Sequence, residues 1–368
     1  MTYSYLIAAR RSPIAPRGGA LAHLQPHALA APVLAAALAD AGISADQVGE
    51  LIVSNALSAG GNIARLVALG AGWPQRIAGL SIDRQCAGGL DALTLADALI
   101  RSGQHDIVVA GGVESYSRRP LRSHRFADGR PPEPYEQARF TPWPDRDPDM
   151  AQAADQLAQD LGISRAAQDD WAMASHAKAR ITPEIVPVAG LDHDPFTRNL
   201  TPRHCARAPV VTGTITAANM AVAADGAGFV VMASEAWVAA RGINAVGFAG
   251  GATLGGDPLR PGLAPVAAID AVLARAGLTA HDLTAAEIME AFAVQAIACQ
   301  QGANIAPDII NTHGGALARG HPVGASGAVL AVRLFHELRS KGGTGLAAIA
   351  AAGGIGTAIL LDQNRENS

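Results

Sequence analysis

The stretch that decides the fold is Cys86–Gly103, "CAGGLDALTLADALIRSG", where a helical pattern begins directly behind a cysteine and two glycines. Its apolar residues include Leu90, Leu93, Ala98 and Leu99, and they predict a helix over 89–101. The short apolar run "DIVVAGG" follows at Asp106 and is typical of a buried strand. A helix that leads into a buried strand indicates α/β layers.

The same order of elements returns near the C-terminus. The segment "GASGAVLAVRLFHELRSKGG" begins at Gly324 and leads into "LAAIAAAGG", which begins at Leu346. When Gly89 is aligned with Gly327, the Arg-Ser pairs near the helix ends coincide, and each helix feeds a strand that ends in Ala-Gly-Gly. This internal repeat predicts two related α/β halves.

Further apolar runs alternate with helical patterns along the chain. The runs "YLIAA", "ELIVSNAL" and "AVGFAGG" read as strands, and 28–41 reads as a helix. Hydrophobic residues make up 49% of the chain, and its 40 glycines suit layers that pack closely. The fold class is therefore α/β with covered sheets.

Composition also excludes several functional classes. The net charge of −4 gives no reason to expect nucleic acid or an acidic membrane as a partner. The three cysteines lie far apart without CxxC spacing, which argues against a disulfide framework and a zinc site. Neither a signal peptide nor an apolar run of about eighteen residues is evident. We expect a soluble cytoplasmic protein that uses no metal.

One region departs from the layered pattern. Residues 118–150 are rich in proline and charge and show no periodicity, which predicts an excursion over the surface. Core-like sequence returns near Val222. We therefore expect a first half over 1–117 and 223–241, an inserted region over 118–222, and a second half over 242–368.

Two residues are candidates for chemistry. Cys86 precedes a helix start, where amides and the helix dipole are expected to lower a thiol pKa, but a buried structural thiol remains an alternative. His321 lies in the glycine-rich loop "NTHGGALARGHPVGASGA" and precedes the second-half helix much as Cys86 precedes the first. A pseudo-dyad between the halves would bring the pair together for Cys–His nucleophilic catalysis. His313, in the same loop, is expected to be structural.

Six motifs along nearly the whole chain resemble those of the thiolase family. They are "AARRSPIAPRGGALA", "CAGGLDAL", "VVAGGVESYS", "GTITAAN", "EAFAVQ" and "GGALARGHPVGASGA". The resemblance implies a five-layered αβαβα fold, an inserted loop domain that covers coenzyme A, and a homodimer or homotetramer. It implies ping-pong acyl transfer from acyl-CoA, with Cys86 as the nucleophile and His321 as its activating base. Coenzyme A is then substrate or product, and no separate cofactor is implied.

The sequence departs from the family pattern at two catalytic positions. Ala350 stands where, by the resemblance, a second cysteine would remove the α-proton of the acceptor. Some branches of the family place this base in the segment that reads "MEAF" here, but that position is Ala291 in this chain. Cys299 lies beyond that segment and is expected in the core. Met289 replaces an asparagine that holds an oxyanion-hole water, and loss of one such donor typically costs about 100- to 1000-fold in rate.

The resemblance also assigns binding positions. It places the second oxyanion hole at backbone amides near Cys86 and near Ala352 and Gly353. Ala221 replaces a serine near the pantetheine arm, and Phe292 lies in a late active-site loop. Arg119 and Arg122 belong to a run of five arginines that could grip the phosphates of coenzyme A, although solvated or subunit-contacting side chains are the alternative.

Together these features predict an acyl-CoA acyltransferase that acylates Cys86. Carbon–carbon bond formation of the usual type is doubtful, because Ala350 supplies no base. A thioesterase, in which water resolves the acyl-cysteine, is one alternative. A degenerate thiolase-like scaffold that binds acyl-CoA without turnover is the other.

Overall fold

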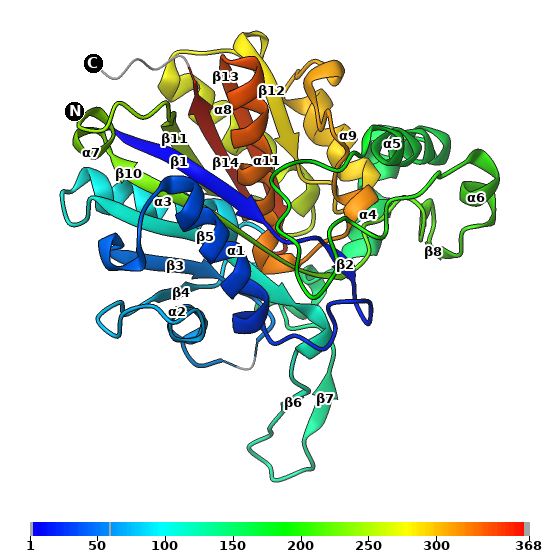
Figure 1. The fold of residues 1–368 in the computed structure, drawn as a ribbon. Helices are drawn as coiled ribbons and strands as arrows, with labels where there is room; N and C mark the ends of the chain where they lie inside the picture. The colour runs from blue at the N-terminus through cyan, green and yellow to red at the C-terminus, as the bar shows by residue number, and fades with distance from the viewer. Residues whose placement is uncertain (1–2, 59, 364–368) are drawn as a thin grey trace.

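The computed structural model describes residues 3–58 and 60–363 as two α/β halves around a shared middle layer of helices (Figure 1). The strands of the first half are β1 (Ser4–Arg11), β2 (Ala15–Pro16), β3 (Glu50–Ser54), β4 (Leu80–Ile82), β5 (Ile107–Ser115) and β10 (Ala224–Ser234). Those of the second half are β11 (Val246–Gly255), β12 (Leu283–Ile288), β13 (Thr344–Ala351) and β14 (Ile355–Asp362).

Each half has its own run of neighbouring strands. The order is β4-β3-β5-β10-β1 in the first half and β11-β14-β13-β12 in the second, with β2 beside β10. Strands β3 and β12 pair in parallel with their neighbours, and the other neighbours pair antiparallel. A short antiparallel contact between β1 and β11, at Tyr5–Gly247 and Leu6–Val246, joins the two runs into one path.

Helices cover the outer faces of both runs and fill the space between them, which gives the five-layered αβαβα arrangement. The helices of the two halves are α1 (Pro26–Ala41), α2 (Ile63–Gly70), α3 (Gly88–Arg101), α7 (Glu235–Ala239), α8 (Ala264–Ala276), α9 (Ala293–Gly302), α10 (Ala316–Arg319) and α11 (Ser326–Lys341). Helices α1 and α2 share an apolar core with one face of the first half, and α8 and α9 share one with the second.

Successive side chains along each strand point to opposite faces of the sheet, so apolar residues alternate between an outer core and the core of the middle layer. In β3, Leu51 and Val53 join the core under α1 and α2, whereas Ile52 faces the middle layer. In β14, Leu360 joins the core under α8, whereas Leu361 faces the middle layer. This period of two explains why the strands read as continuous apolar runs, since both faces are buried.

The middle layer consists of α3 and α11, the two helices that the internal repeat predicts. Their backbones come into contact at Gly89 and Gly327. A β-carbon on Gly89 would lie 2.2 Å from the amide nitrogen of Ala328, and one on Gly327 would lie 2.6 Å from that of Leu90. Only glycine permits this backbone contact. The two aligned glycines therefore meet, and the predicted apposition of the helix starts is confirmed.

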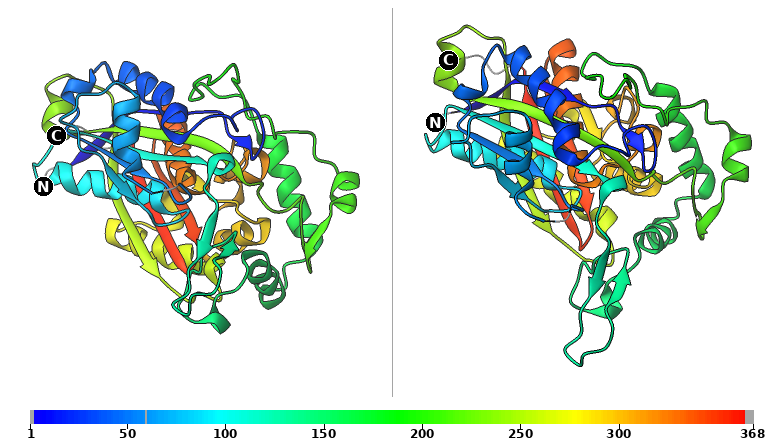
Figure 2. Two further views of the ribbon diagram at one scale, coloured as in Figure 1. Left: turned by 90° about the horizontal axis from the view of Figure 1, so that it is seen from below. Right: turned by 60° about the horizontal axis from the view of Figure 1, so that its bottom comes forward.

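The segment between β5 and β10 forms an outlying region of two parts. A hairpin of β6 (Arg122–His124) and β7 (Glu133–Tyr135) projects away from the layers in Figure 1 and in the right view of Figure 2. The second part comprises α4 (Met150–Leu161), α5 (Arg165–Lys178), α6 (Pro202–Arg207), β8 (Val210–Thr212) and β9 (Ile215–Thr216). Helices α4 and α5 pack against α9, and side chains of Asp149 and Ser164 cap their N-termini.

The expected strands and helices of the layers are present. The hairpin lies within residues 118–150, for which the sequence predicted no regular structure. Its strands are short and mostly exposed, so no apolar alternation marks them. Stacking of His124 on Tyr135, with ring centroids 4.2 Å apart, accompanies the pairing. Within residues 3–58 and 60–363, none of the helices combines the length and apolar character needed to cross a membrane.

Candidate active site

The fold brings Cys86 and His321 into direct contact. Cys86 lies in the turn between β4 and α3, and His321 lies in the loop between α10 and α11. Cys86 Sγ is 3.1 Å from His321 Nε2. The His321 backbone is held beside β10, since its N–H donates to the Val222 carbonyl and its carbonyl accepts from Ala224. The pairing that the internal repeat predicts is present.

The turn that presents Cys86 is conformationally unusual. Gln85 has φ 52°, which is a left-handed conformation that non-glycine residues rarely adopt. The Asp83 side chain accepts from the Gln85 amide at 2.9 Å, and the Arg84 carbonyl accepts from Ala87. A residue in this conformation costs of order 1–3 kcal/mol and persists because its surroundings hold it. The strain lies directly before the candidate nucleophile.

Burial sets the protonation state of Cys86. Desolvation raises the pKa of the Cys86 thiol to about 12, and the charges of Glu114 and Asp83 add to that increase. Its own backbone amide acts in the opposite direction, but less strongly. The expectation that the helix start lowers this pKa was therefore wrong, because enclosure by protein outweighs the nearby amides. At neutral pH the resting form is a thiol.

His321 is neutral for the same reason. Burial lowers the pKa of its imidazole to about 4. Ser326 Oγ lies 2.6 Å from Nδ1. If Nδ1 carries the single ring proton and donates it to Ser326, then Nε2 is left with a free lone pair that accepts the Cys86 S–H. The pair is thus a thiol beside a neutral base, ready for proton transfer when sulfur attacks.

A cavity of about 440 Å³ opens over this pair. Cys86 and His321 lie on its wall together with Ala350, Ala351 and Ala352 from the end of β13. Ala221 and Phe292 also line it, as the resemblance implies. Cys86 is partly accessible from the cavity although the surrounding protein encloses it.

One apolar wall of the cavity comes from α4, which sequence reasoning missed. Met150, Ala153, Ala154 and Leu157 all line the cavity. Their spacing of three, four and seven residues places them on one helix face. The pattern was visible in "MAQAADQL", but nothing in the sequence showed that this face adjoins Cys86 rather than an ordinary core.

Two of the five arginines reach the cavity. Arg119 and Arg122 line it, whereas Arg118, Arg125 and Arg130 do not line it in the described part of the chain. Arg119 pairs with Glu136 and lies over the Tyr116 ring, 4.5 Å from its centroid. Arg122 donates to the Ala56 carbonyl at 3.2 Å.

Two predicted site residues lie elsewhere. The Met289 side chain is 1% exposed and belongs to the middle core, so it does not line the cavity. Gly353 occupies the turn after β13 with φ 79° and is not among the described lining residues, and a β-carbon there would lie 3.1 Å from the Phe140 carbonyl oxygen. Cys299 is fully buried, with Sγ 3.3 Å from the Gly262 carbonyl, which confirms its expected place in the core.

A buried carboxylate holds the loops around the pair. Glu114, at the end of β5, accepts hydrogen bonds from the Ala56 amide at 3.0 Å and from the Gly324 amide at 3.0 Å. It also accepts from the Asn55 side chain at 2.9 Å. Burial raises the pKa of Glu114 to about 7 in spite of these donors. Glu114 thereby ties the loop after β3 to the loop that carries His321.

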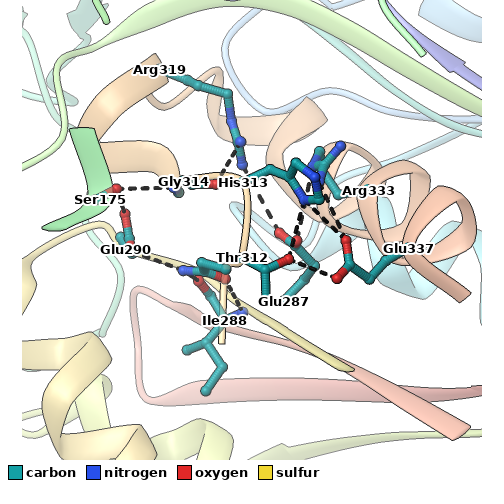
Figure 3. Close-up of polar contacts among 12 residues, drawn as sticks. Ser175, Glu287, Ile288, Glu290, Thr312, His313, Gly314, Arg319, Arg333 and Glu337 are labelled. Atoms are coloured by element: carbon teal, nitrogen blue, oxygen red, sulfur yellow. Dashed lines mark hydrogen bonds and ion pairs between the residues drawn. The ribbon is translucent and has the colours of Figure 1, made fainter. Parts of the chain in front are cut away.

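A second carboxylate anchors the other end of the His321 loop. Glu290 accepts from Trp171 Nε1, Ser175 Oγ and the Leu317 amide at 3.0, 2.7 and 3.1 Å. Figure 3 shows Glu290 beside Ser175. It also accepts from the Asn311 side chain at 2.8 Å. Glu114 and Glu290 therefore both organise loops by hydrogen bonding.

Behind this loop lies a cluster of buried charges (Figure 3). Arg333 Nη1 contacts Glu184 at 2.7 Å, and Arg319 Nη1 donates to the Gly314 carbonyl at 2.6 Å. His313 Nδ1 lies 3.0 Å from Glu337 on the outer side of the cluster. His313 is therefore structural, as expected. The described residues contain no group of three or more His, Cys, Asp or Glu side chains placed to hold a metal ion.

Known proteins share this architecture. The family model for the thiolase N-terminal domain matches residues 4–236, and that for the C-terminal domain matches 245–363. The provisionally assigned acetyl-CoA C-acetyltransferase YhfS of Bacillus subtilis (strain 168) is 38% identical over 97% of this chain and 98% of its own length. The provisionally assigned acetyl-CoA C-acetyltransferase VraB of Staphylococcus aureus (strain MRSA252) is 36% identical over 98% and 99%.

Solved structures agree with these matches. The crystal structure of the Bacillus anthracis acetyl-CoA acetyltransferase has a TM-score of 0.91 and 31% identity, covering 98% of this chain and 99% of that one. The crystal structure of human mitochondrial 3-ketoacyl-CoA thiolase has a TM-score of 0.90 and 29% identity, covering 99% of both chains.

Proposed function

This chain belongs to the thiolase family, and from that premise we propose that it is an acyl-CoA acyltransferase that works through an acyl thioester on Cys86. The observation that carries the proposal is the 3.1 Å contact between Cys86 Sγ and His321 Nε2 on the wall of the cavity. The names of the 38% and 36% identical relatives, as acetyl-CoA C-acetyltransferases, support the same class of reaction.

The neutral pair suits general-base acylation. As Cys86 Sγ attacks the thioester carbonyl, its proton passes to His321 Nε2. Backbone amides near Cys86 and in the Ala352 turn stabilise the negative oxygen that develops. When the tetrahedral species collapses, the coenzyme A thiolate leaves and takes the proton from Nε2. Neutral His321 is thereby restored for the second half-reaction.

The cavity offers complementary surfaces for the donor. Arg119 and Arg122 supply positive charge for the phosphates of coenzyme A. Ala221, Phe292 and the α4 face supply apolar contacts for the pantetheine arm and the acyl group. The residues present therefore fit acyl-CoA.

The proposal is tested by exchange of label between acetyl-CoA and free coenzyme A, which requires only the first half-reaction. Wild-type protein should equilibrate the label with no acceptor present. Cys86→Ala should abolish exchange, and His321→Ala should slow it by about 100- to 10 000-fold, the range for a general base. Cys299→Ser changes a cysteine outside the cavity and should retain exchange. Absence of exchange in the wild type would contradict the proposal.

The fate of the acyl group separates the transferase from the alternatives. Loss of acyl groups to water without coenzyme A would point to a thioesterase. Binding of acyl-CoA without exchange or hydrolysis would point to a scaffold without turnover.

We also propose self-association at the β4 edge of the first half. Leu80 on β4, Leu66 and Leu69 on α2, and Leu95 on α3 are large apolar side chains left exposed. Strand β4 ends the path and leaves its outer edge unpaired within the described residues. A second copy could cover this surface. Light scattering should give a dimer or tetramer, and Leu80→Asp should shift it toward monomer.

A further inference from the structure

Few groups on the cavity wall can accept a proton. Among the described lining residues, the side chains with that capacity are Asp83, Cys86, Tyr116, Glu136 and His321. Asp83 accepts from the Gln85 amide in the turn before Cys86. Glu136 is 77% exposed and pairs with Arg119, and Tyr116 Oη accepts from Arg119 at 3.3 Å. His321 is the one neutral base in contact with the reacting sulfur.

The wall near β13 is apolar. Ala350, Ala351 and Ala352, whose side chains are single methyl groups, line the cavity there. Neither of the other two cysteines is among the described lining residues: Cys205 lies in the core beneath α5, and Cys299 is fully buried behind the wall, with Sγ 3.3 Å from the Gly262 carbonyl and from Gln295 Nε2. The described cavity therefore holds no second thiol or carboxylate at β13 that could take a proton from carbon.

This arrangement restricts the acceptor. Making a carbanion from an ordinary thioester requires a base placed at the α-carbon, and such a base is worth about 100- to 10 000-fold in rate. Yet the relatives are named as C-acetyltransferases, which implies a carbon acceptor. Loss of carbon dioxide from a β-carboxyl thioester yields the same carbanion without any base.

We propose that the acceptor is a malonyl-type thioester, whose decarboxylation next to Ala350 supplies the carbanion that attacks acyl-Cys86. This inference rests on the proposed function. The bond between the α-carbon and the carboxylate breaks and releases CO₂, and its electron pair forms the new bond to the acyl carbon. The C–S bond to Cys86 breaks, and the thiolate takes one proton from solvent. The products are a 3-oxoacyl thioester and CO₂.

The surroundings favour this step. In the proposed complex Arg119 and Arg122 face the phosphates of coenzyme A, and the residues that line the cavity at the end of β13, Ala350, Ala351 and Ala352, carry no charged side chain. A carboxylate there is poorly solvated, and CO₂ release removes that localised charge. Burial also favours the uncharged form of the groups beside the site, since it raises the pKa of Glu114 and lowers that of His321.

The test starts from acetylated wild-type protein freed of excess acetyl-CoA. Malonyl-CoA labelled with ¹³C in its free carboxylate, acetyl-CoA, or free coenzyme A is then added. We expect malonyl-CoA to give acetoacetyl-CoA with one ¹³CO₂ for each product molecule. Acetyl-CoA should give at least about 100-fold less product, because no base is available for it.

A gain-of-function variant tests the cause. Ala350→Cys places a thiol on the cavity wall and should raise condensation with acetyl-CoA by about 100-fold or more. Ala350→Ser adds a group of similar size that is a far weaker base, and should not produce this gain. If both variants gain equally, the missing base at this position is not the reason for the selectivity.

Each remaining outcome decides the inference. Equal condensation with acetyl-CoA and malonyl-CoA in the wild type would overturn it, since a base must then exist. Acetylated protein that reacts with coenzyme A but leaves malonyl-CoA intact would also overturn it, while the proposed acyl-Cys86 chemistry would stand. Failure to acetylate the protein at all would instead remove the proposed function on which the inference depends.

Discussion

Gly89 and Gly327 face each other across the middle layer so closely that a β-carbon on Gly89 would lie 2.2 Å from the amide nitrogen of Ala328. Gly89 lies three residues after Cys86, and Gly327 lies six residues after His321. The contact therefore fixes how near the two helix starts can come. The 3.1 Å separation of Cys86 Sγ and His321 Nε2 follows from a backbone approach that side chains would prevent.

Gly89→Ala should destabilise the protein by about 1–3 kcal/mol, because the new methyl group meets backbone that cannot move aside easily. The midpoint of urea unfolding should fall accordingly. Gly255→Ala is the matched control, since a β-carbon there meets nothing within 4 Å. Its effect should stay within about 0.5 kcal/mol. Equal effects of the two changes would contradict the close contact of α3 and α11.

The acylation rate should be flat through neutral pH and fall only as pH approaches 4. Protonated His321 cannot accept the Cys86 proton, and burial places its pKa at about 4. The pKa of Cys86, about 12, gives no further rise near neutrality. Single-turnover release of coenzyme A across pH, with circular dichroism to verify folding at each point, measures this. An acid limb near pH 6.5 would contradict a buried, neutral histidine.

The stability of the wild type relative to Glu114→Gln should fall as pH rises from about 5 to 8. Glu114 has a pKa of about 7 when folded against 4.5 when unfolded, so the folded state binds the extra proton in that window. The relative loss is of order 3 kcal/mol from the size of the shift. Urea unfolding of both proteins at the two pH values measures it. A relative gain with rising pH would show that the donors around Glu114 outweigh its burial.

Met289→Asn should lower stability without restoring condensation. The Met289 side chain lies in the middle core, where an unpartnered amide costs about 1–3 kcal/mol. Met289→Leu conserves volume and should cost less than about 1.5 kcal/mol. Unfolding midpoints and condensation rates with acetyl-CoA test both variants. A marked rise in rate for Met289→Asn would mean that position 289 reaches the reacting oxygen.

The sequence predicted the layered architecture because its strongest signals are local and repeated. The apolar runs predicted the long strands of the two halves, and the alignment of Gly89 with Gly327 predicted which helices meet. That alignment also placed Cys86 beside His321. Both inferences needed only the order and spacing of residues.

Other features depend on neighbours that are distant in sequence. The pKa of Cys86 rises because several segments enclose it, so the local helix start pointed in the wrong direction. The Met289 side chain, directly after β12, points into the middle core rather than into the cavity, and this depends on how the end of β12 packs in the fold. The α4 face looked like ordinary core because its partners, including Phe292 and Cys86, come from other parts of the chain.

The most direct test of the account is the mass of the Cys86 peptide after brief exposure of the protein to acetyl-CoA and an acid quench. We predict an added acetyl group on Cys86 in the wild type, and much slower labelling in His321→Ala. The acetyl group should disappear from Cys86 when free coenzyme A is supplied before the quench. An unmodified Cys86 in protein that binds acetyl-CoA, or an acetyl group on another residue, would contradict the account.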